Sequence, residues 1–274
     1  MGTMKLAAIQ MTSGDNIAAN IAALETLLRE AVAAGAGFIA TPENTFYMRR
    51  EGMAAMTDVP MAAHPGIAYA REAARAQGVW LLIGSIRARE AGMAAPYNRS
   101  VLIAPDGEIA ATYDKIHLFD VTLPDGTSYR ESSQAVAGAR PVVAPMGEAM
   151  LGMSICYDLR FPALYQALSG AGATLLAVPS AFTRPTGAAH WRTLLSARAI
   201  ENACYVIAPA QCGTHPGGRE TYGHSLILDP WGEVLAEASA DTPQVIYATF
   251  DPARLAAIRA QIPVLAHRRE IERD

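Results

Sequence analysis

Three side chains that can together hydrolyse an amide each follow a short apolar run that predicts a buried strand: Glu43 after 38–41, Lys115 after 108–113 and Cys156 after 149–155. A thiol needs a base or a nearby positive charge before it attacks a carbonyl carbon at neutral pH. Glu43 can take the thiol proton and return it to the leaving amine, while Lys115 can stabilise the oxyanion. These residue types therefore predict a cysteine hydrolase that works through a thioester.

The stretch 152–162, Gly-Met-Ser-Ile-Cys-Tyr-Asp-Leu-Arg-Phe-Pro, predicts a strand that turns into a helix at the cysteine. The backbone N–H groups of Tyr157 and Asp158 are then expected near a helix N-terminus. Positive partial charge at that place lowers the pKa of a thiol and stabilises an oxyanion. Position alone leaves Cys156 equally open to a second interpretation, a small buried hydrophobic residue.

Each of the other candidates also has an ordinary interpretation when it is taken alone. Glu43 suits a loop residue or a helix cap, and Lys115 suits a solvated charge at a strand end. Glu131 lies in the segment 116–137, which is long and lacks periodicity, and it suits a surface charge. Long loops in compact domains are often functional, however, so Glu131 stays a candidate.

The remaining cysteines and histidines leave other possibilities open. Cys204 and Cys212 bracket the apolar run 205–210 and are expected in or near the core. Cys212 and His215 have metal-ligand spacing, but no second pair completes four ligands, so no metal is expected. A Cys-His-Asn hydrolase using His117 or His190 remains an alternative to Glu43 as the base. Ser154 lies two residues before the cysteine and is expected to be a core hydroxyl.

Alternating strands and helices predict an α/β protein. Strands are expected at 5–10, 38–41, 79–85, 142–144, 149–155, 175–179, 205–210 and 245–250, and helices at 16–34, 66–77, 163–169, 188–202 and within 251–262. The last long helix is expected to bury Trp191, Leu194, Leu195 and Ile200. The hairpins 98–113 and 225–238 resemble one another, which predicts two similar half-sheets. Packed face to face with helices outside, they would form a four-layer α-β-β-α sandwich of two mixed sheets.

Composition narrows the class of protein. The chain has 274 residues without a linker, which predicts one domain over 1–274, with the polar tail 251–274 against a partner subunit. The net charge of −4 and scattered basic residues argue against nucleic acid as a partner. No apolar run approaches the ~20 residues of a membrane span, and no signal peptide is evident. Three cysteines without paired spacing favour the reducing cytoplasm.

Three motifs together resemble the nitrilase superfamily of carbon–nitrogen hydrolases, in that family's order: Pro-Glu at 42–43, Tyr-Asp-Lys-Ile-His-Leu-Phe-Asp at 113–120, and Ser-Ile-Cys-Tyr-Asp-Leu-Arg-Phe-Pro at 154–162. The resemblance runs from Lys5 to about Arg269. It implies a Glu43-Lys115-Cys156 triad with Glu131 as the fourth functional residue, which either contacts substrate or orients Lys115. It further implies the α-β-β-α sandwich, a homodimer or higher even oligomer, and no cofactor.

Further segments resemble the Nit amidase branch: 182–191, 197–207, 211–213, 222–225 and 229–232. This resemblance implies a small 2-oxo-acid amide as substrate, above all deaminated glutathione, with 2-oxoglutarate and cysteinylglycine as products. The alternatives are an omega-amidase acting on 2-oxoglutaramate, another aliphatic amidase or a nitrilase, and a binding protein without activity on the same fold.

The expected substrates carry a carboxylate, and a guanidinium holds a carboxylate through two parallel hydrogen bonds. Arg160 is the candidate for that contact, with a structural ion pair as the alternative. Tyr47 and Thr183 are further candidates for the substrate pocket. The backbone N–H of Tyr157 completes the expected binding set, as a donor to the oxyanion.

Overall fold

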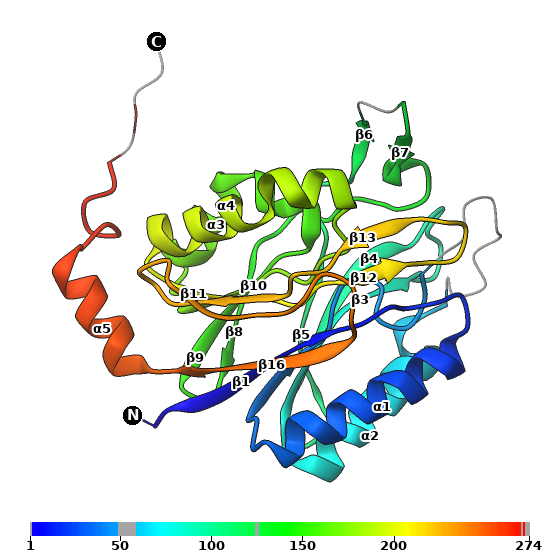
Figure 1. Ribbon diagram of the computed structural model, residues 1–274, viewed down its shortest axis with the longest axis horizontal. Helices are drawn as coiled ribbons and strands as arrows, with labels where there is room; N and C mark the ends of the chain where they lie inside the picture. Colours follow the sequence, from blue (N-terminus) through cyan, green and yellow to red (C-terminus); the bar gives the residue numbers. More distant parts are fainter. Residues whose placement is uncertain (1, 49–58, 124–125, 270, 272–274) are drawn as a thin grey trace.

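Two six-stranded sheets pack face to face, and helices cover their outer faces (Figure 1). The computed structural model describes residues 2–48, 59–123, 126–269 and 271. The four-layer α-β-β-α sandwich expected from the sequence is therefore confirmed. Within the described ranges, no helix is both long enough and apolar enough to cross a membrane.

The first sheet has the order β16-β1-β2-β3-β4-β5. Strands β1, β2 and β3 are parallel, and β16 and β4 are antiparallel to their neighbours. Two helices, α1 (Ile17–Ala33) and α2 (Pro65–Gln77), cover its outer face (Figure 1). The strands are β1 (Met4–Gln10), β2 (Phe38–Ala40), β3 (Trp80–Ala88), β4 (Tyr97–Ile103), β5 (Ile109–Asp114) and β16 (Gln244–Phe250).

The second sheet has the order β15-β14-β11-β10-β9-β8, with β9, β10 and β11 parallel. Its outer face carries α3 (Pro162–Gly170) and α4 (Arg184–Asn202) (Figure 1). The strands are β8 (Val142–Met146), β9 (Ala149–Met153), β10 (Leu175–Ala177), β11 (Tyr205–Ala208), β14 (Leu226–Leu228) and β15 (Val234–Glu237).

Both faces of each central strand are buried, which explains why these strands are continuously apolar rather than alternating. In β1, Leu6 and Ala8 belong to the core between the sheets, whereas Ala7 and Ile9 pack beneath α1 and α2. Successive side chains of a strand point to opposite faces, so one strand supplies two cores. The stacked sheets thereby bring their strand ends to one edge of the sandwich.

Helix α4 differs from the sequence prediction in its start and in its buried face. It begins at Arg184, not at 188, because Pro185 occupies its first turn, where the missing proline N–H costs nothing. Trp191 and Leu195 are buried as expected, but Ile200 is 52% exposed, so its expected burial was wrong. The buried side follows the helical spacing through Ala199, which turns Ile200 outward.

Two short hairpins are present that the sequence analysis did not predict. They are β6 (Asp120–Thr122) with β7 (Ser128–Arg130), and β12 (Cys212–Thr214) with β13 (Glu220–Tyr222). Their three-residue strands are too short to show a period of two. The other elements are three 3₁₀ helices, η1 (Met61–Ala63), η2 (Glu131–Ser133) and η3 (Cys156–Arg160), and the helix α5 (Pro252–Gln261).

Candidate active site

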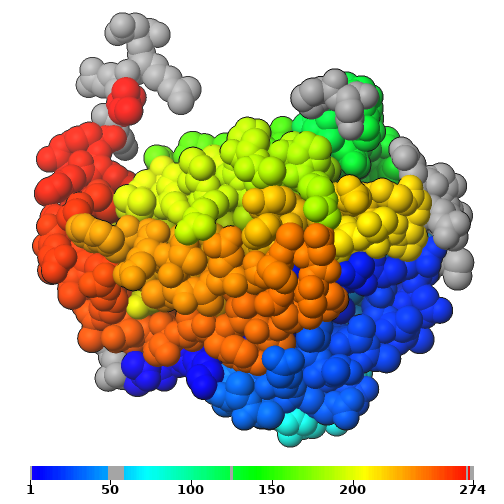
Figure 2. Space-filling view, viewed as in Figure 1, coloured from blue at the N-terminus to red at the C-terminus, as the bar shows by residue number. Residues whose placement is uncertain are grey.

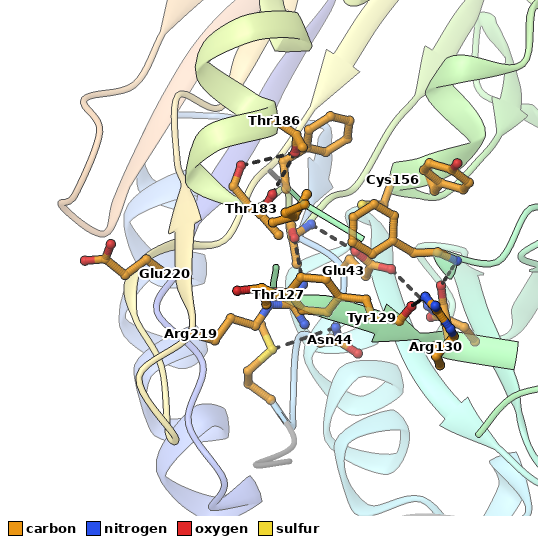
Figure 3. Close-up of a pocket in the computed structure, with 18 of the residues that line it drawn as sticks. Glu43, Asn44, Thr127, Tyr129, Arg130, Cys156, Thr183, Thr186, Arg219 and Glu220 are labelled. Atoms are coloured by element: carbon orange, nitrogen blue, oxygen red, sulfur yellow. Dashed lines mark hydrogen bonds between the residues drawn. The ribbon is translucent and has the colours of Figure 1, made fainter. Parts of the chain in front are cut away.

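A cavity of about 480 Å³ lies at the edge where the strand ends of both sheets meet. The eight residues that the sequence analysis predicted to be catalytic or substrate-binding all line this cavity: Glu43, Tyr47, Lys115, Glu131, Cys156, Tyr157, Arg160 and Thr183. Figure 3 shows that Glu43, Cys156 and Thr183 reach this cavity from different elements. Residues far apart in sequence meet here because parallel strands end at the same edge of a sheet.

Cys156 occupies a sharp turn between β9 and η3. Its φ of 50° is left-handed, a conformation that a residue with a Cβ adopts at an energetic cost. The backbone N–H of Cys156 donates to the carbonyl of Pro179 at 3.0 Å, which ties the turn to the end of β10. The predicted strand-to-helix turn is thus present, but a 3₁₀ helix precedes α3 at Pro162.

Asp158 holds this turn in place and was missed as a functional residue. Its fully buried carboxylate accepts from the backbone N–H of Ile155 at 2.9 Å and from the hydroxyl of Tyr113 at 2.7 Å. It also accepts from the backbone N–H of His117 at 3.0 Å. Asp158 therefore connects the turn in the second sheet to the end of β5. The only signal in the sequence was its place beside the cysteine.

The two backbone donors expected near the thiol differ in availability. The N–H of Asp158 donates to the carbonyl of Ile155 at 3.1 Å. Because that hydrogen bond occupies it, the expected contribution of Asp158 to an oxyanion site is wrong. The N–H of Tyr157, the residue directly after the cysteine, is the remaining candidate.

Lys115 lies between two carboxylates. Its Nζ donates to Oε1 of Glu43 at 2.9 Å and to Oε2 of Glu131 at 2.9 Å. Lys115 is 2% exposed and Glu43 is 3% exposed, so both charges are removed from water. Glu131 is held in turn by the backbone N–H of Phe119, which donates to its Oε2 at 2.7 Å. A buried charge is stable only when it is paired in this way.

Asn98, on β4, bridges the two carboxylates and was not foreseen. Its Nδ2 donates to Oε1 of Glu43 and to Oε1 of Glu131, both at 2.9 Å. The amide thus holds the two acids at a fixed separation on either side of Lys115. A lone asparagine on a strand gives no signal of such a role in sequence, because its partners lie 55 and 33 positions away.

Glu43 is kept ionised by its surroundings. Burial raises the pKa of Glu43, but the charge of Lys115 and its hydrogen bond outweigh burial and hold that pKa below its ordinary value. The backbone N–H of Ala181 donates to Oε2 at 2.9 Å, and the thiol of Cys156 also forms a hydrogen bond with this carboxylate. Glu43 is therefore an ionised carboxylate beside the thiol, as a general base would be.

The same surroundings act on the other two groups. Burial lowers the pKa of Lys115, but the charges of Glu131 and Glu43 hold that pKa well above its ordinary value. Burial, together with the charge of Glu43, raises the pKa of Cys156 far above that of a free thiol, although Lys115 opposes the shift. The expectation of a lowered thiol pKa is therefore wrong, because desolvation outweighs the local positive charge.

The model of the carbon–nitrogen hydrolase family matches residues 5–260. The chain belongs to this family. It is 45% identical over 269 residues to the deaminated glutathione amidase of Synechocystis, with 96% of this chain and 97% of that protein covered. The structure of the C. elegans NitFhit protein has a TM-score of 0.88 and 36% identity, and the match covers 98% of this chain and 66% of that one. A mutant amidase from Nesterenkonia has a TM-score of 0.81 and 25% identity over 97% of this chain and 94% of that one, and carries an acetamide moiety on its active-site cysteine.

The two histidines considered as an alternative base in this carbon–nitrogen hydrolase, His117 and His190, are engaged with other side chains. Nδ1 of His117 lies 2.7 Å from Oδ1 of Asp158, and the ring stacks on Phe161 with centroids 3.6 Å apart. His190 accepts from the guanidinium of Arg160 at 3.3 Å. Glu43 occupies the position beside Cys156, so the Cys-His-Asn arrangement gains no support.

Arg160 lies between two aromatic rings at the cavity. Its guanidinium carbon is 5.8 Å from the centroid of Tyr157 and 5.6 Å from that of Phe182. Within the described part of the chain, no carboxylate forms an ion pair with Arg160, so the structural ion pair is not seen. Tyr47 and Thr183 are buried in the cavity wall, and the hydroxyl of Thr183 lies 2.8 Å from that of Thr186.

The residue pair with metal-ligand spacing is engaged elsewhere. His215 is buried and contacts the carbonyl of Ser13 at 2.9 Å and the hydroxyl of Thr221 at 2.7 Å. The thiol of Cys212 lies 3.3 Å from the hydroxyl of Thr12. Among the described residues, no three His, Cys, Asp or Glu side chains come together as metal ligands would.

Proposed function

We propose that this protein is a cysteine amidase that hydrolyses deaminated glutathione to 2-oxoglutarate and cysteinylglycine. The observation that carries the proposal is the convergence of Glu43, Lys115 and Glu131 beside Cys156 in one cavity. The proposed substrate is the one in the name of the Synechocystis deaminated glutathione amidase, to which the chain is similar over nearly its full length. The covalent adduct on the cysteine of the Nesterenkonia amidase supports Cys156 as the nucleophile.

In the first half of the reaction, the sulfur of Cys156 attacks the γ-carbonyl carbon of the substrate. The thiol proton passes to Glu43 as the carbon–sulfur bond forms, because a thiol with a raised pKa does not ionise beforehand. The carbonyl oxygen becomes an oxyanion, which the ammonium of Lys115 and the N–H of Tyr157 stabilise. Glu43 then returns its proton to the amine nitrogen, the carbon–nitrogen bond breaks, and cysteinylglycine leaves.

In the second half, a water molecule attacks the thioester. Glu43 takes a proton from that water as the carbon–oxygen bond forms. When the tetrahedral intermediate collapses, the carbon–sulfur bond breaks, 2-oxoglutarate leaves, and the sulfur regains its proton from Glu43. One carboxylate thus serves both halves, and the surroundings that keep it ionised at rest make it ready to accept a proton each time.

The supporting residues have separate roles in this proposal. Glu131 does not act on the substrate but orients Lys115, because both of its oxygens accept hydrogen bonds from the ammonium. Asn98 is a positioning residue for the two carboxylates. Arg160 binds the carboxylate of the 2-oxo acid, while Tyr47 and Thr183 shape the pocket around the acyl group.

The deciding experiment measures 2-oxoglutarate release from deaminated glutathione and from 2-oxoglutaramate side by side, with C156A as the blank. Preference for deaminated glutathione supports the proposal. Preference for 2-oxoglutaramate would make the protein an omega-amidase, and ammonia release from nitriles would make it a nitrilase. If no amide or nitrile is hydrolysed, the protein is a binding protein on this fold.

We also propose that the chain folds as one domain over 1–274 and works in the cytoplasm as a homodimer or higher even oligomer, without a cofactor. The helix α5 and the described residues that follow it, 262–269, lie on the outside of the sandwich (Figure 2). Ile262, directly after α5, is an exposed large apolar residue, and so are Ile200, Trp231 and Leu235 on other elements. Sedimentation of the wild type and of a variant truncated after Phe250 tests whether the tail 251–274 holds a partner.

A further inference from the structure

Arginine side chains gather at the cavity, but most of them have their charge or donors engaged. Five arginines line it: Arg87, Arg130, Arg160, Arg184 and Arg219. Arg184 pairs with Asp241 at 2.5 Å, and Arg130 donates to the carbonyls of Val121 and Tyr129 at 3.1 and 2.9 Å. Arg87 donates to the carbonyl of Gln134.

In the described part of the chain, no carboxylate forms an ion pair with Arg160, Arg219 or Arg130. Among these three, Arg160 and Arg219 have a guanidinium beside an aromatic ring of the cavity wall, whereas Arg130 donates to backbone carbonyls. The proposed substrate carries two carboxylates, one on the 2-oxo acid and one on the terminal glycine. The competing substrate 2-oxoglutaramate carries only one. The two guanidinium groups held beside aromatic rings of the cavity therefore match the substrate with two acids.

The backbone of Arg219 is fixed although it lies in a short hairpin. Gly217 and Gly218 form the turn with φ of 85° and 83°, values that glycine adopts without strain. The N–H of His215 donates to the carbonyl of Arg219 at 2.8 Å. Because His215 is itself buried and held by Ser13 and Thr221, the hairpin presents Arg219 at a defined position.

The side chain of Arg219 is held over the cavity and keeps donors for a ligand. Its Nη2 donates to the carbonyl of Ala181 at 2.9 Å, and its guanidinium lies 5.5 Å from the ring centroid of Tyr129. Its Nε is buried and has no hydrogen-bond partner among the described residues. Figure 3 shows Arg219 beside Tyr129, whereas Glu220 points outward. The hydrogen bond to Ala181 uses one donor of the guanidinium, and a carboxylate bound in the cavity can accept from the donors that remain.

Ala181 shows on which side of the scissile bond Arg219 lies. The N–H of Ala181 donates to Oε2 of Glu43 at 2.9 Å, while its carbonyl accepts from Arg219. The backbone of Ala181 therefore links the guanidinium of Arg219 to the carboxylate of Glu43. Glu43 must protonate the departing amine, so the leaving group lies on this side of the bond. Arg160, in contrast, follows the nucleophile and lies between Tyr157 and Phe182.

We infer that Arg219 binds the terminal carboxylate of the departing amine and so selects amides whose leaving group carries an acid. This inference rests on the proposed function and assigns the two ends of its substrate. Arg160 would hold the acyl half and Arg219 the amine half. Loss of a charged hydrogen-bond pair in a partly buried site weakens recognition by about 10- to 100-fold.

The test compares three amides: deaminated glutathione, the same compound with its terminal carboxylate converted to a carboxamide, and 2-oxoglutaramate. We expect the wild type to prefer the acid over its carboxamide by about 10- to 100-fold in kcat/KM. R219Q should raise KM for the acid by that factor and leave the other two amides within about threefold, so that the preference disappears. R219K should retain part of it, because lysine keeps the charge but not the planar pair of donors.

R130Q is the matched control, because Arg130 lines the same cavity but donates to backbone carbonyls. It should leave the preference for the acid intact. An equal loss on all three amides in R219Q would overturn the inference, since Arg219 would then act through Glu43 or the fold. No loss in R219Q would overturn it as well. Wild-type hydrolysis of 2-oxoglutaramate alone, or of none of the three, would overturn the proposed function and this inference with it.

Discussion

The strand ends and the two short hairpins that line the cavity differ in burial and in what holds their side chains. At the strand ends, Glu43 and Lys115 are 3% and 2% exposed and are fixed by several hydrogen bonds each. On the hairpins β6–β7 and β12–β13, Tyr129 reaches the cavity from the three-residue strand β7, and Arg219 from the residue directly before β13. Groups that exchange protons need a water-excluded position, whereas groups that recognise a substrate can lie at the entrance.

We therefore expect a substitution at the strand ends to lower the activity on every substrate. The effect of a substitution on the hairpins should differ from one substrate to another. Glu131 is the exception that connects the two regions. It follows β7 on the first hairpin, yet its carboxylate binds the ammonium of Lys115. The predictions below test this division, beginning with the largest effect.

Removal of the thiol should have the largest effect, because no other group forms the thioester. C156A should reduce kcat by about 10⁴-fold or more on every amide tested, with little change in folding. Release of 2-oxoglutarate and thermal unfolding measure the two quantities. C204A is the matched control, since Cys204 is also buried and free but does not line the cavity. Residual activity of C156A within 100-fold of the wild type would mean that another residue is the nucleophile.

Removal of the Glu43 charge should have the second-largest effect on activity, and it should also change the pKa of the Cys156 thiol. E43Q should lower kcat by about 10²- to 10⁴-fold. Burial and the charge of Glu43 raise the pKa of Cys156, while Lys115 lowers it. Without the Glu43 charge, the rate of alkylation should therefore rise with pH at a lower midpoint than in the wild type. Mass spectrometry of Cys156 labelling measures this midpoint, and an unchanged or higher midpoint would contradict the assigned contact.

Glu131 should behave like a strand-end residue although it lies beside a hairpin. E131Q should lower kcat by about 10- to 100-fold on every amide, because Lys115 loses a charged partner. R130Q, one position earlier, should leave kcat nearly unchanged. Steady-state kinetics of both variants decide the point. If E131Q raised KM for one substrate only, Glu131 would contact substrate instead of orienting Lys115.

The smallest effect concerns stability at alkaline pH. The folded protein holds the Cys156 thiol neutral with a raised pKa, whereas the unfolded chain ionises it near 9.0. The neutral thiol contributes its full amount to the free energy of unfolding when the pH is below that ordinary value. This contribution declines as the pH rises from there toward the pKa of the folded protein. Between pH 8 and 10, the wild type should lose about 1–2 kcal/mol of unfolding free energy relative to C156A. Urea unfolding at both pH values measures the difference, and parallel curves would show that the thiol pKa is not raised.

Much of the architecture could be predicted because the core strands carry a strong local signal. The apolar runs at 38–41 and 149–155 correspond to β2 and β9, and the amphipathic run at 16–34 corresponds to α1. The short hairpins could not be predicted, since three residues show no period. The exposure of Ile200 was missed because Ala199 and Ile200 are both apolar, and the sequence alone does not decide which of them continues the buried face of the helix.

The sequence by itself determined which candidate residues meet in one cavity, because thiol, carboxylate and ammonium groups after buried strands predict a shared edge. Only the tertiary structure decided how they act on one another. Glu43 and Ala181 are 138 positions apart, and no local pattern reveals that they form a hydrogen bond. The direction of the thiol pKa was also decided there, since local positive charge predicts a lowered value, whereas complete burial beside Glu43 raises it. Desolvation depends on every element packed around a group, and packing exists only in the folded chain.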